Sequence, residues 1–219
     1  APNGAFFCGI KSIFLLKIQN MSLKKAYILV FLVLIIDQVS KIYIKTHFFI
    51  GESIKVMGLD WFQIHFIENE GMAWGAVIPG EYGKLFLTLF RIVAVGGIGW
   101  WLWDAVRKNA SNYLKVAIAL ILAGAVGNII DSVFYGVIFN DSYHQVATLF
   151  SDEPYGRWFH GEVVDMFYFP FWEGNLPSWL PVWGGKPFSF FNAIFNVADV
   201  AISTGVGILI VFNKKAFGK

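Results

Sequence analysis

Residues 26–36 read AYILVFLVLII, an unbroken run of apolar side chains. Extended to about residue 44, the run is long enough to cross the hydrocarbon core of a bilayer as a helix, which takes about 20 mainly apolar residues. Three further stretches share this character, at about residues 85–106, 113–138 and 190–212. The sequence therefore predicts an all-α polytopic membrane protein with four transmembrane helices.

The overall composition agrees with a membrane protein. Of the 219 residues, 57% are hydrophobic, 18% are aromatic and only 15% are charged, whereas an average soluble domain has about 25% charged residues. Such sparse charge argues against a disordered chain, a nucleic-acid binder and an ordinary cytosolic enzyme. We expect membrane lipids around the protein and no nucleic-acid partner.

Basic residues mark one common end of the four expected spans. They are Lys24 and Lys25 before the first span, Arg107, Lys108 and Lys115 between the second and third, and Lys214, Lys215 and Lys219 after the fourth. The two long segments between spans, about residues 45–84 and 139–189, have few basic residues for their length. By the positive-inside rule, both termini are expected in the cytoplasm and both long loops outside.

The two outer loops are expected to be structured. Residues 61–67, WFQIHFI, partly alternate like a β-strand. The second loop is rich in aromatic residues, namely Trp158, Phe159, Phe167, Tyr168, Phe169, Phe171, Trp172, Trp179 and Trp183. One interpretation is an interfacial belt of rings, and the other is a small extracytoplasmic β-platform that holds a lipid-borne substrate. The sequence leaves both interpretations open.

The N-terminal region reads as an addition to this domain. Met21 is followed by two lysines and then by the first apolar run, as in a natural start. We expect residues 1–20 to be a non-native or upstream extension and residues 21–219 to form a single domain. The one cysteine, Cys8, excludes an intrachain disulfide and a multi-cysteine metal site.

Polar side chains inside the expected spans are costly and are therefore candidates for a functional site. They are Asp37, Gln38, Ser40 and Lys41 in the first span, Asn128 and Asp131 in the third, and Asn192, Asn196, Asp199 and Ser203 in the fourth. On one continuous helix the last four would share a face. Asp165 follows two valines among aromatic residues and is expected near the outer boundary.

Such groups also hold helices together, at roughly 1 kcal/mol or less per pair, which is the simplest interpretation of Asn192 and Ser203. Asp37 and Lys41 are one turn apart, so an ion pair is as plausible as a functional role. Asp199 has no basic residue in its own span, and such a carboxylate must find a partner or stay protonated. Arg91 in the second span is a candidate partner for Asp131, or it extends outward to the interface.

Two carboxyl groups that share a proton are the working parts of an aspartic protease, because one activates water and the other protonates the scissile carbonyl. Spacing alone leaves Asp131 as a rival of Asp165. The motifs of zinc proteases, serine proteases and P-loop ATPases are absent from the sequence. A small proton-coupled transporter with Asp37, Asp131 and Asp199 as a relay also fits, although no internal repeat supports it. A lipid-binding or assembly protein is a third possibility.

Five segments, taken in order, resemble bacterial lipoprotein signal peptidase, also called signal peptidase II, an aspartic protease of the inner membrane. They are residues 37–41 (DQVSK), 68–75 (ENEGMAWG), 124–131 (GAVGNIID), 161–165 (GEVVD) and 195–199 (FNVAD). With the four spans, the resemblance covers about residues 24–213. It implies that the active site lies near the outer face of the membrane.

The resemblance also implies the roles of particular residues. Asp165 and Asp199 correspond to the catalytic pair of the family. The supporting residues that it implies are Asp37, Lys41, Asn69, Gly71, Asn128, Asp131 and Asn196. The implied reaction is cleavage of diacylglyceryl-modified prolipoproteins just before the lipidated lipobox cysteine, with no metal or organic cofactor. Nothing in the sequence demands an oligomer, so we expect a monomer.

One departure from the family concerns a basic residue. Ser132 follows Asp131 at a position where the family usually has arginine. Because that arginine supports the site, we expect another cation to replace it. The candidates are Arg91 and Arg157.

Two further departures concern the outer loops. About two dozen residues, 137–160, separate two glycines that are usually only a few residues apart. This insertion is expected to cover the site, to contact the mature part of the substrate, or to have no role. In the second family segment, Glu70, Met72 and Trp74 replace smaller residues, which bears on the shape of the substrate groove.

Overall fold

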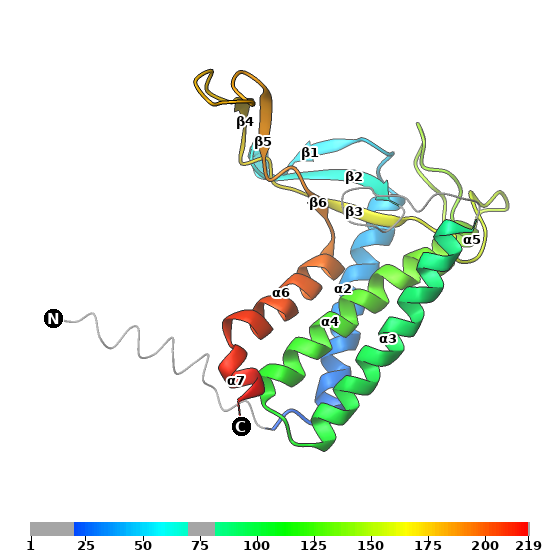
Figure 1. Ribbon diagram of the computed structural model, residues 1–219. Helices are drawn as coiled ribbons and strands as arrows, with labels where there is room; N and C mark the ends of the chain where they lie inside the picture. The colour runs from blue at the N-terminus through cyan, green and yellow to red at the C-terminus, as the bar shows by residue number, and fades with distance from the viewer. Residues whose placement is uncertain (1–19, 70–81, 219) are drawn as a thin grey trace.

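The structure is a computed structural model that describes residues 20–69 and 82–218 (Figure 1). Residues 1–19, which belong to the expected extension, lie outside this description. So do residues 70–81, which include Gly71, Glu70, Met72 and Trp74.

Among the described residues, three helices are long and apolar enough to cross a membrane, as predicted for the first three spans. They are α2 (Leu23–Lys45), α3 (Gly83–Arg107) and the continuous helical stretch Asn112–Ile138. The last consists of α4 (Asn112–Ile130), the π-helical segment η3 (Asp131–Tyr135) and α5 (Gly136–Ile138). The remaining helix, α6 (Val197–Val211), has 15 residues and is followed by the short α7 (Asn213–Phe217). The chain is therefore a polytopic membrane protein in which three spans reach full length.

The predicted fourth span, at about residues 190–212, begins too early. Residue 190 ends a strand, and α6 begins only after Asn196, whose side chain accepts a hydrogen bond from the backbone N–H of Asp199 at 2.9 Å. The Asp199 side chain in turn accepts from the backbone N–H of Asn196, which completes a capping box. Asn192 thus lies outside the helix. The prediction that Asn192, Asn196, Asp199 and Ser203 share one helical face is therefore wrong. Hydropathy gives the length of the apolar run, but it does not show that Asn196 caps the helix and so sets where α6 begins.

A four-stranded antiparallel sheet lies at one end of the helices (Figure 1). Its order is β1 (Ser53–Lys55), β2 (Gln63–Asn69), β3 (Val163–Tyr168) and β6 (Ile194–Phe195), and the 3₁₀ turn η1 (Val56–Gly58) follows β1. The strand predicted at residues 61–67 is confirmed with a shift of two residues. The fold is consequently helical with a small sheet, as the expected β-platform requires, and not purely α-helical.

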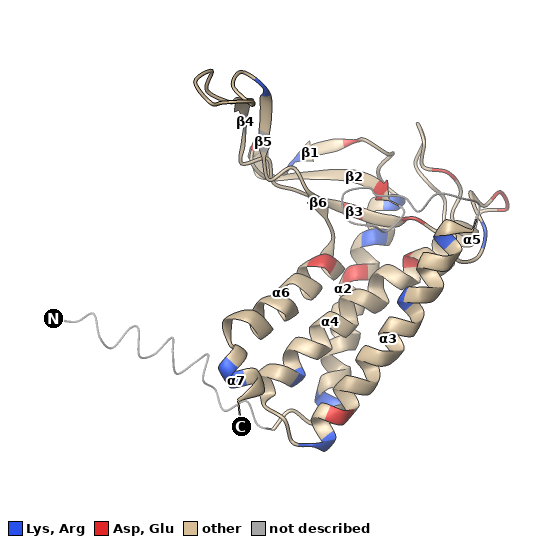
Figure 2. Cartoon of the chain, viewed as in Figure 1, with Lys and Arg blue, Asp and Glu red and all other residues tan. Residues whose placement is uncertain are grey.

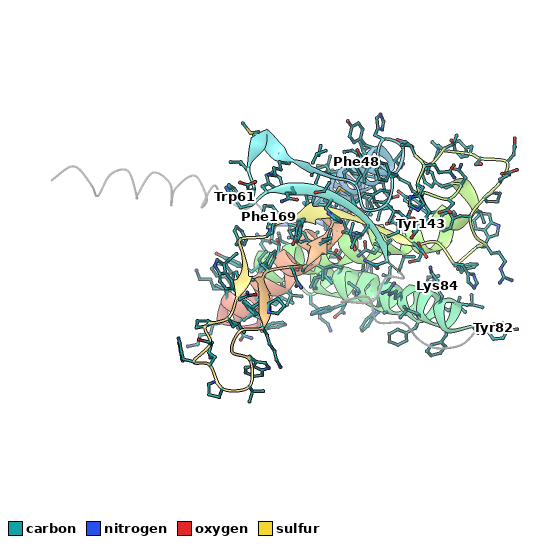
Figure 3. The ribbon with its side chains drawn as sticks, turned by 90° about the horizontal axis from the view of Figure 1, so that it is seen from above. Phe48, Trp61, Tyr82, Lys84, Tyr143 and Phe169 are labelled. Carbon is teal, nitrogen blue, oxygen red and sulfur yellow. The ribbon has the colours of Figure 1, made fainter. Side chains whose placement is uncertain are left out.

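Aromatic side chains from both loops, among them Phe167, Phe169 and Phe171 of the second, pack beside this sheet. The rings of Phe62 and Phe169 stack with centroids 4.7 Å apart, and Trp61 lies 6.4 Å from Phe169. Figure 3 shows Trp61 and Phe169 together over the strands. A separate hairpin of β4 (Trp172–Asn175) and β5 (Pro187–Phe190) extends sideways from the sheet (Figures 1 and 3). The two long segments between the helices therefore form an aromatic platform.

The basic residues gather as the sequence predicts. Lysines and arginines lie where α2 begins, where α3 ends and at α7, all at the end of the bundle opposite the sheet (Figure 2). Most acidic side chains lie at the other end, where the helices meet the strands, together with further basic residues such as Lys41 and Lys45 of α2 (Figure 2). The charge asymmetry is thus a property of the folded molecule.

The insertion at residues 137–160 packs against the ends of the helices. The backbone N–H of Gly156 donates to the carbonyl oxygen of Gly136 at 2.8 Å, and that of Ala147 donates to Lys45 at 3.2 Å. Phe139 and Ala147 join a buried cluster with residues of α2, β2 and β3. This cluster fastens the sheet to the helical bundle.

α4 is the central helix and packs against α2, α3 and α6. A Cβ atom on Gly124 of α4 would lie 2.2 Å from the carbonyl oxygen of Ala198 and 2.7 Å from Cγ1 of Ile202. Both contacts are closer than real Cβ atoms allow, and the first is with backbone. Glycine at this position is therefore required by the close approach of α6.

We expect Gly124→Ala to push α4 and α6 apart and to lower stability by about 1–3 kcal/mol, the usual cost of overpacking a core. Thermal unfolding in detergent measures the effect. Gly97→Ala on α3 is the matched control, because a Cβ atom at Gly97 meets nothing within 4 Å. Equal unfolding temperatures for the two variants would contradict the close contact.

Candidate active site

The predicted site residues converge where the helices meet the sheet. Asp37 and Lys41 lie on α2, Asn128 on α4, Asp131 at the start of η3, Asn69 at the end of β2, Asp165 on β3, and Asn196 and Asp199 at the start of α6. Gly71 belongs to the part of the chain outside the described residues. Five segments that are far apart in the sequence thus build one polar cluster.

Asp165 is almost completely buried in the middle of β3. Its Oδ1 accepts a hydrogen bond from Asn196 Nδ2 at 2.6 Å, and its Oδ2 accepts one from Asn69 Nδ2. Burial raises the pKa of Asp165 to about 8, and the negative charge of nearby Asp199 contributes to the increase. This carboxyl group is therefore protonated at neutral pH.

Asp199 occupies the first turn of α6. Its Oδ1 accepts from Asn128 Nδ2 at 3.0 Å, and its Oδ2 accepts from the backbone N–H of Asn196 at 3.3 Å. The first turn of a helix also has a partial positive charge, which stabilises an acidic side chain by about 0.3–1 kcal/mol. Hydrogen-bond donors thus surround the Asp199 carboxylate.

Two amide side chains connect these carboxyl groups. Asn196 accepts from the backbone of Asp199 through Oδ1 and donates to Asp165 through Nδ2. Asn128 Oδ1 accepts from Lys41 Nζ at 2.9 Å, while its Nδ2 donates to Asp199. The amides therefore fix the positions of both carboxyl groups relative to each other.

Lys41 lies in a buried ion cluster next to this pair. Its Nζ is 2.8 Å from Oδ2 of Asp131 and 3.1 Å from Oδ2 of Asp37, and all three side chains are 0% exposed. The ion pair predicted between Asp37 and Lys41 is confirmed. The partnership suggested between Arg91 and Asp131 is wrong, because Asp131 pairs with Lys41.

Carboxylate oxygens of Asp131 and Asp37 also hold the backbone beside Asp165 and Asp199. Asp131 Oδ2 accepts from the backbone N–H of Val164 at 3.3 Å, next to Asp165. Asp37 Oδ1 accepts from the backbone N–H of Ala198 at 2.9 Å, next to Asp199. Asp131, the rival of Asp165 by spacing, is thus engaged in holding β3.

Two residues contribute that the predicted site did not include. Gln38 Nε2 donates to Asp131 Oδ1 at 2.9 Å and to Asp37 Oδ2 at 3.1 Å, while its Oε1 accepts from the hydroxyl of Tyr135 at 3.2 Å. The position of Gln38 among the polar residues of the first span was a usable signal. Nothing in the sequence singles out Tyr135.

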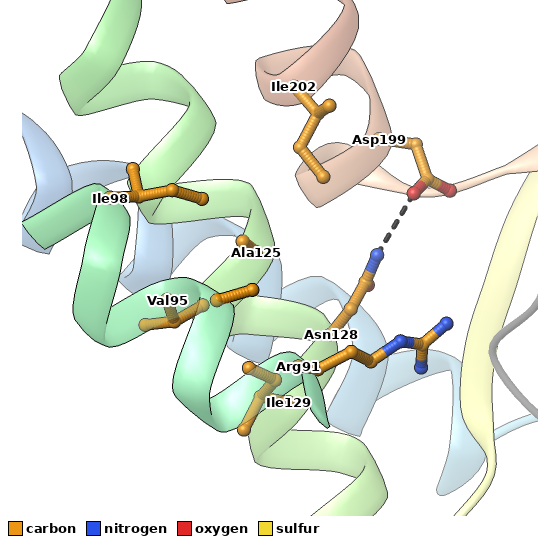
Figure 4. A pocket seen from close by; sticks show the side chains of 9 residues that line it. Arg91, Val95, Ile98, Ala125, Asn128, Ile129, Asp199 and Ile202 are labelled. Carbon is orange, nitrogen blue, oxygen red and sulfur yellow. Dashed lines mark hydrogen bonds between the residues drawn. The ribbon is translucent and has the colours of Figure 1, made fainter. Parts of the chain in front are cut away.

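The two carboxyl groups face different cavities. Asp199, Asn128 and Arg91 line a cavity of about 260 Å³ between α3, α4 and α6 (Figure 4). Asp165 lines another of about 760 Å³ beside the sheet, together with Asn69 and residues 192–194. The carboxyl pair therefore lies between a cavity enclosed by three helices and a cavity beside the sheet.

The position after Asp131 provides no cation. Ser132 is buried, and its hydroxyl donates to the carbonyl oxygen of Asn128 at 3.1 Å. Arg157 is exposed on the insertion, whereas Arg91 lines the cavity of Asp199 (Figure 4). Of the two expected replacements, only Arg91 lies at the site.

The chain resembles known proteins in sequence and in structure. The sequence profile of the family described as signal peptidase (SPase) II matches residues 29–214. A protein named lipoprotein signal peptidase from Porphyromonas gingivalis is 52% identical over 185 residues, covering 84% of this chain and 80% of that protein. A second protein named lipoprotein signal peptidase, from Amoebophilus asiaticus, is 38% identical over 198 residues, which covers 88% of this chain and 78% of that protein.

A solved structure has the same fold. It is described as "Bacterial membrane enzyme structure by the in meso method at 2.3 A resolution" and superposes with a TM-score of 0.58 at 25% identity. The match covers 90% of this chain and 93% of the other. The chain therefore belongs to the signal peptidase II family, and cleavage of signal peptides from prolipoproteins is its activity.

Proposed function

We propose that the chain is an intramembrane aspartic endopeptidase in which Asp165 and Asp199 form the catalytic pair. The observation that carries this proposal is the bridge through Asn196, which binds one carboxyl group through its side chain and caps the helix of the other. The two groups also differ in their surroundings. Asp165 is buried with a pKa of about 8, and Asp199 sits among N–H donors.

These surroundings suggest which group acts first as acid and which as base. Asp199 takes a proton from water as the water oxygen attacks the scissile carbonyl carbon, and Asp165 gives its proton to the carbonyl oxygen. In the second step Asp199 passes its proton to the leaving nitrogen as the C–N bond breaks. Asp165 recovers its proton from the collapsing hydroxyl. The products are a carboxylic acid and an amine, and both side chains return to their initial states.

The two cavities suggest how the substrate lies. The signal peptide is apolar and precedes the scissile bond, so we place its end in the cavity between α3, α4 and α6. The chain after the bond, with the diacylglyceryl-modified lipobox cysteine, then lies toward the cavity beside the sheet. In this proposed arrangement of the substrate, the scissile bond lies between Asp165 and Asp199.

We further propose an orientation in the bacterial inner membrane. The basic end of the bundle faces the cytoplasm together with both termini, and the sheet and the site face outward. The aromatic platform rests on the outer leaflet, where rings of tryptophan and phenylalanine lie at the headgroup level. The enzyme acts there as a monomer surrounded by lipid.

The proposal is tested by incubating the purified, detergent-solubilised protein with a purified prolipoprotein, with and without prior diacylglyceryl transfer. Mass spectrometry of the products identifies the bond that is cut. We expect only the lipidated precursor to be cleaved, and the mature product to begin with the lipidated cysteine. Equal cleavage of both precursors, or cleavage elsewhere, would contradict the substrate assignment.

The pH dependence of cleavage follows from Asp165. Its pKa is raised, so the group is protonated below about pH 8 and loses the proton above it. Because the mechanism needs this proton, we expect kcat/KM to fall above about pH 8, approaching tenfold per pH unit. Unfolding temperatures recorded at each pH separate titration from denaturation. A rate that continues to rise up to pH 10 would rule out an acid at this position.

A further inference from the structure

Arg91 is a cation in the membrane-spanning part of the protein. It lies on α3 and shares the cavity of about 260 Å³ with Asp199 and Asn128 (Figure 4). Its positive charge is attracted to Asp199, but no ion pair within 4.0 Å joins the two among the described residues. The guanidinium of Arg91 and the carboxylate of Asp199 therefore share one cavity without forming an ion pair.

One nitrogen of this guanidinium has no acceptor among the described residues. Within residues 20–69 and 82–218, Arg91 Nη1 is buried and donates no hydrogen bond. A buried donor without a partner loses its hydration and gains nothing in return. The cost is greater for a charged group, so an arginine that served only to hold helices together would be a poor choice here.

The other walls of the cavity provide nothing that this nitrogen could bind. They consist of the alanine, valine and isoleucine side chains Ala94, Val95, Ile98, Ala125, Ile129 and Ile202. An apolar chain fits against such walls, and an oxygen on that chain would meet Arg91 at the polar end. The cavity thus combines apolar contact with one charged donor beside the catalytic group.

We propose that Arg91 is a substrate-binding residue that donates a hydrogen bond to a carbonyl oxygen of the bound prolipoprotein. This inference rests on the proposed function. The oxygen belongs either to the peptide backbone next to the scissile bond or to an acyl ester of the diacylglyceryl group, and the chemistry of recognition is the same. Occupation of the cavity by substrate then satisfies the nitrogen that is otherwise unpaired.

The test compares Arg91→Met with the unsubstituted protein. A hydrogen bond to a charged group is lost, so kcat/KM for the lipidated precursor is expected to fall about 10- to 100-fold. The unfolding temperature is expected to stay the same or to rise, because the substitution removes the buried nitrogen of Arg91 that has no acceptor among the described residues. Arg107→Met is the matched control: Arg107 is exposed at the other end of α3, and its replacement should leave kcat/KM unchanged.

A second substrate identifies the oxygen. In a dialkylglyceryl precursor, ether links replace the acyl esters and their carbonyl oxygens. If Arg91 binds an ester, Arg91→Met has no effect on cleavage of this precursor. If Arg91 binds the peptide, the loss is the same for both precursors.

Two results would overturn the inference. One is an unchanged kcat/KM for Arg91→Met with the natural precursor. The other is a lowered unfolding temperature with activity lost only in proportion to unfolded protein, which indicates a structural role. If the unsubstituted protein cleaves neither precursor, the proposed function itself fails, and the inference fails with it.

Discussion

Asp165→Asn and Asp199→Asn are each expected to reduce cleavage of the lipidated precursor by roughly a thousandfold or more. General acid and base catalysis contribute about 10²–10⁴-fold each, and either substitution removes one of the two groups that transfer protons to and from the substrate and water. Asparagine keeps the size of the side chain, so the amide bridge through Asn196 and the capping of α6 are disturbed as little as possible. Single-turnover cleavage measures the loss directly.

The matched control is Asp60→Asn. Asp60 is 85% exposed between β1 and β2 and pairs with the exposed Lys55, and its replacement should leave the rate unchanged. Unfolding temperatures of all three variants show whether the fold is kept. If either site variant keeps more than about a tenth of the normal rate, the assignment of Asp165 and Asp199 as the catalytic pair is wrong. Asp131 would then be examined. Normal function in both variants would favour a lipid-binding role.

Lys41→Met is expected to have the largest effect on stability. The ammonium group lies between Asp37 and Asp131 with all three side chains 0% exposed. Removing one partner of a buried ion pair leaves an uncompensated charge and typically costs about 3–5 kcal/mol. Here two carboxylates lose their cation, and both hold backbone beside Asp165 and Asp199. Thermal unfolding in detergent should show a large decrease, accompanied by loss of activity.

Two comparisons separate the buried cluster from ordinary surface charge. Lys55→Met breaks an exposed pair with Asp60 and should change stability by about 1 kcal/mol or less. Neutralising Asp37 and Asp131 with asparagine in the Lys41→Met background should recover part of the lost stability, since no unpaired charge remains. Equal unfolding temperatures for Lys41→Met and Lys55→Met would refute the buried cluster.

Much of the architecture was predictable from hydropathy. The first three apolar stretches are helices of full length, because an unbroken apolar run specifies a span directly. The start of α6 was not predictable in this way. Phe190 and Ile194 are as apolar as the helix, yet they lie in strands, and Asn196 begins the helix by capping it. The capping box, with Asp199 three residues after Asn196, was the local signal that hydropathy ignored.

The site was predictable in composition but not in its pairings. Spacing within one helix gave the ion pair of Asp37 with Lys41. Spacing says nothing about how two helices are rotated relative to each other, so the sequence could not show that Lys41, and not Arg91, faces Asp131. The choice of Asp165 over Asp131 rested on resemblance to the family. It remains a prediction, and the geometry now gives it physical support.

The central claim is that Asp165 and Asp199 together activate water, and single-turnover cleavage in oxygen-18 water tests it most directly. The account predicts that the new carboxyl group of the released signal peptide gains one labelled oxygen in the first turnover, and that the enzyme gains none. Label found on Asp165 or Asp199, with an unlabelled peptide, would mean that a carboxylate attacks the substrate itself and would contradict the account.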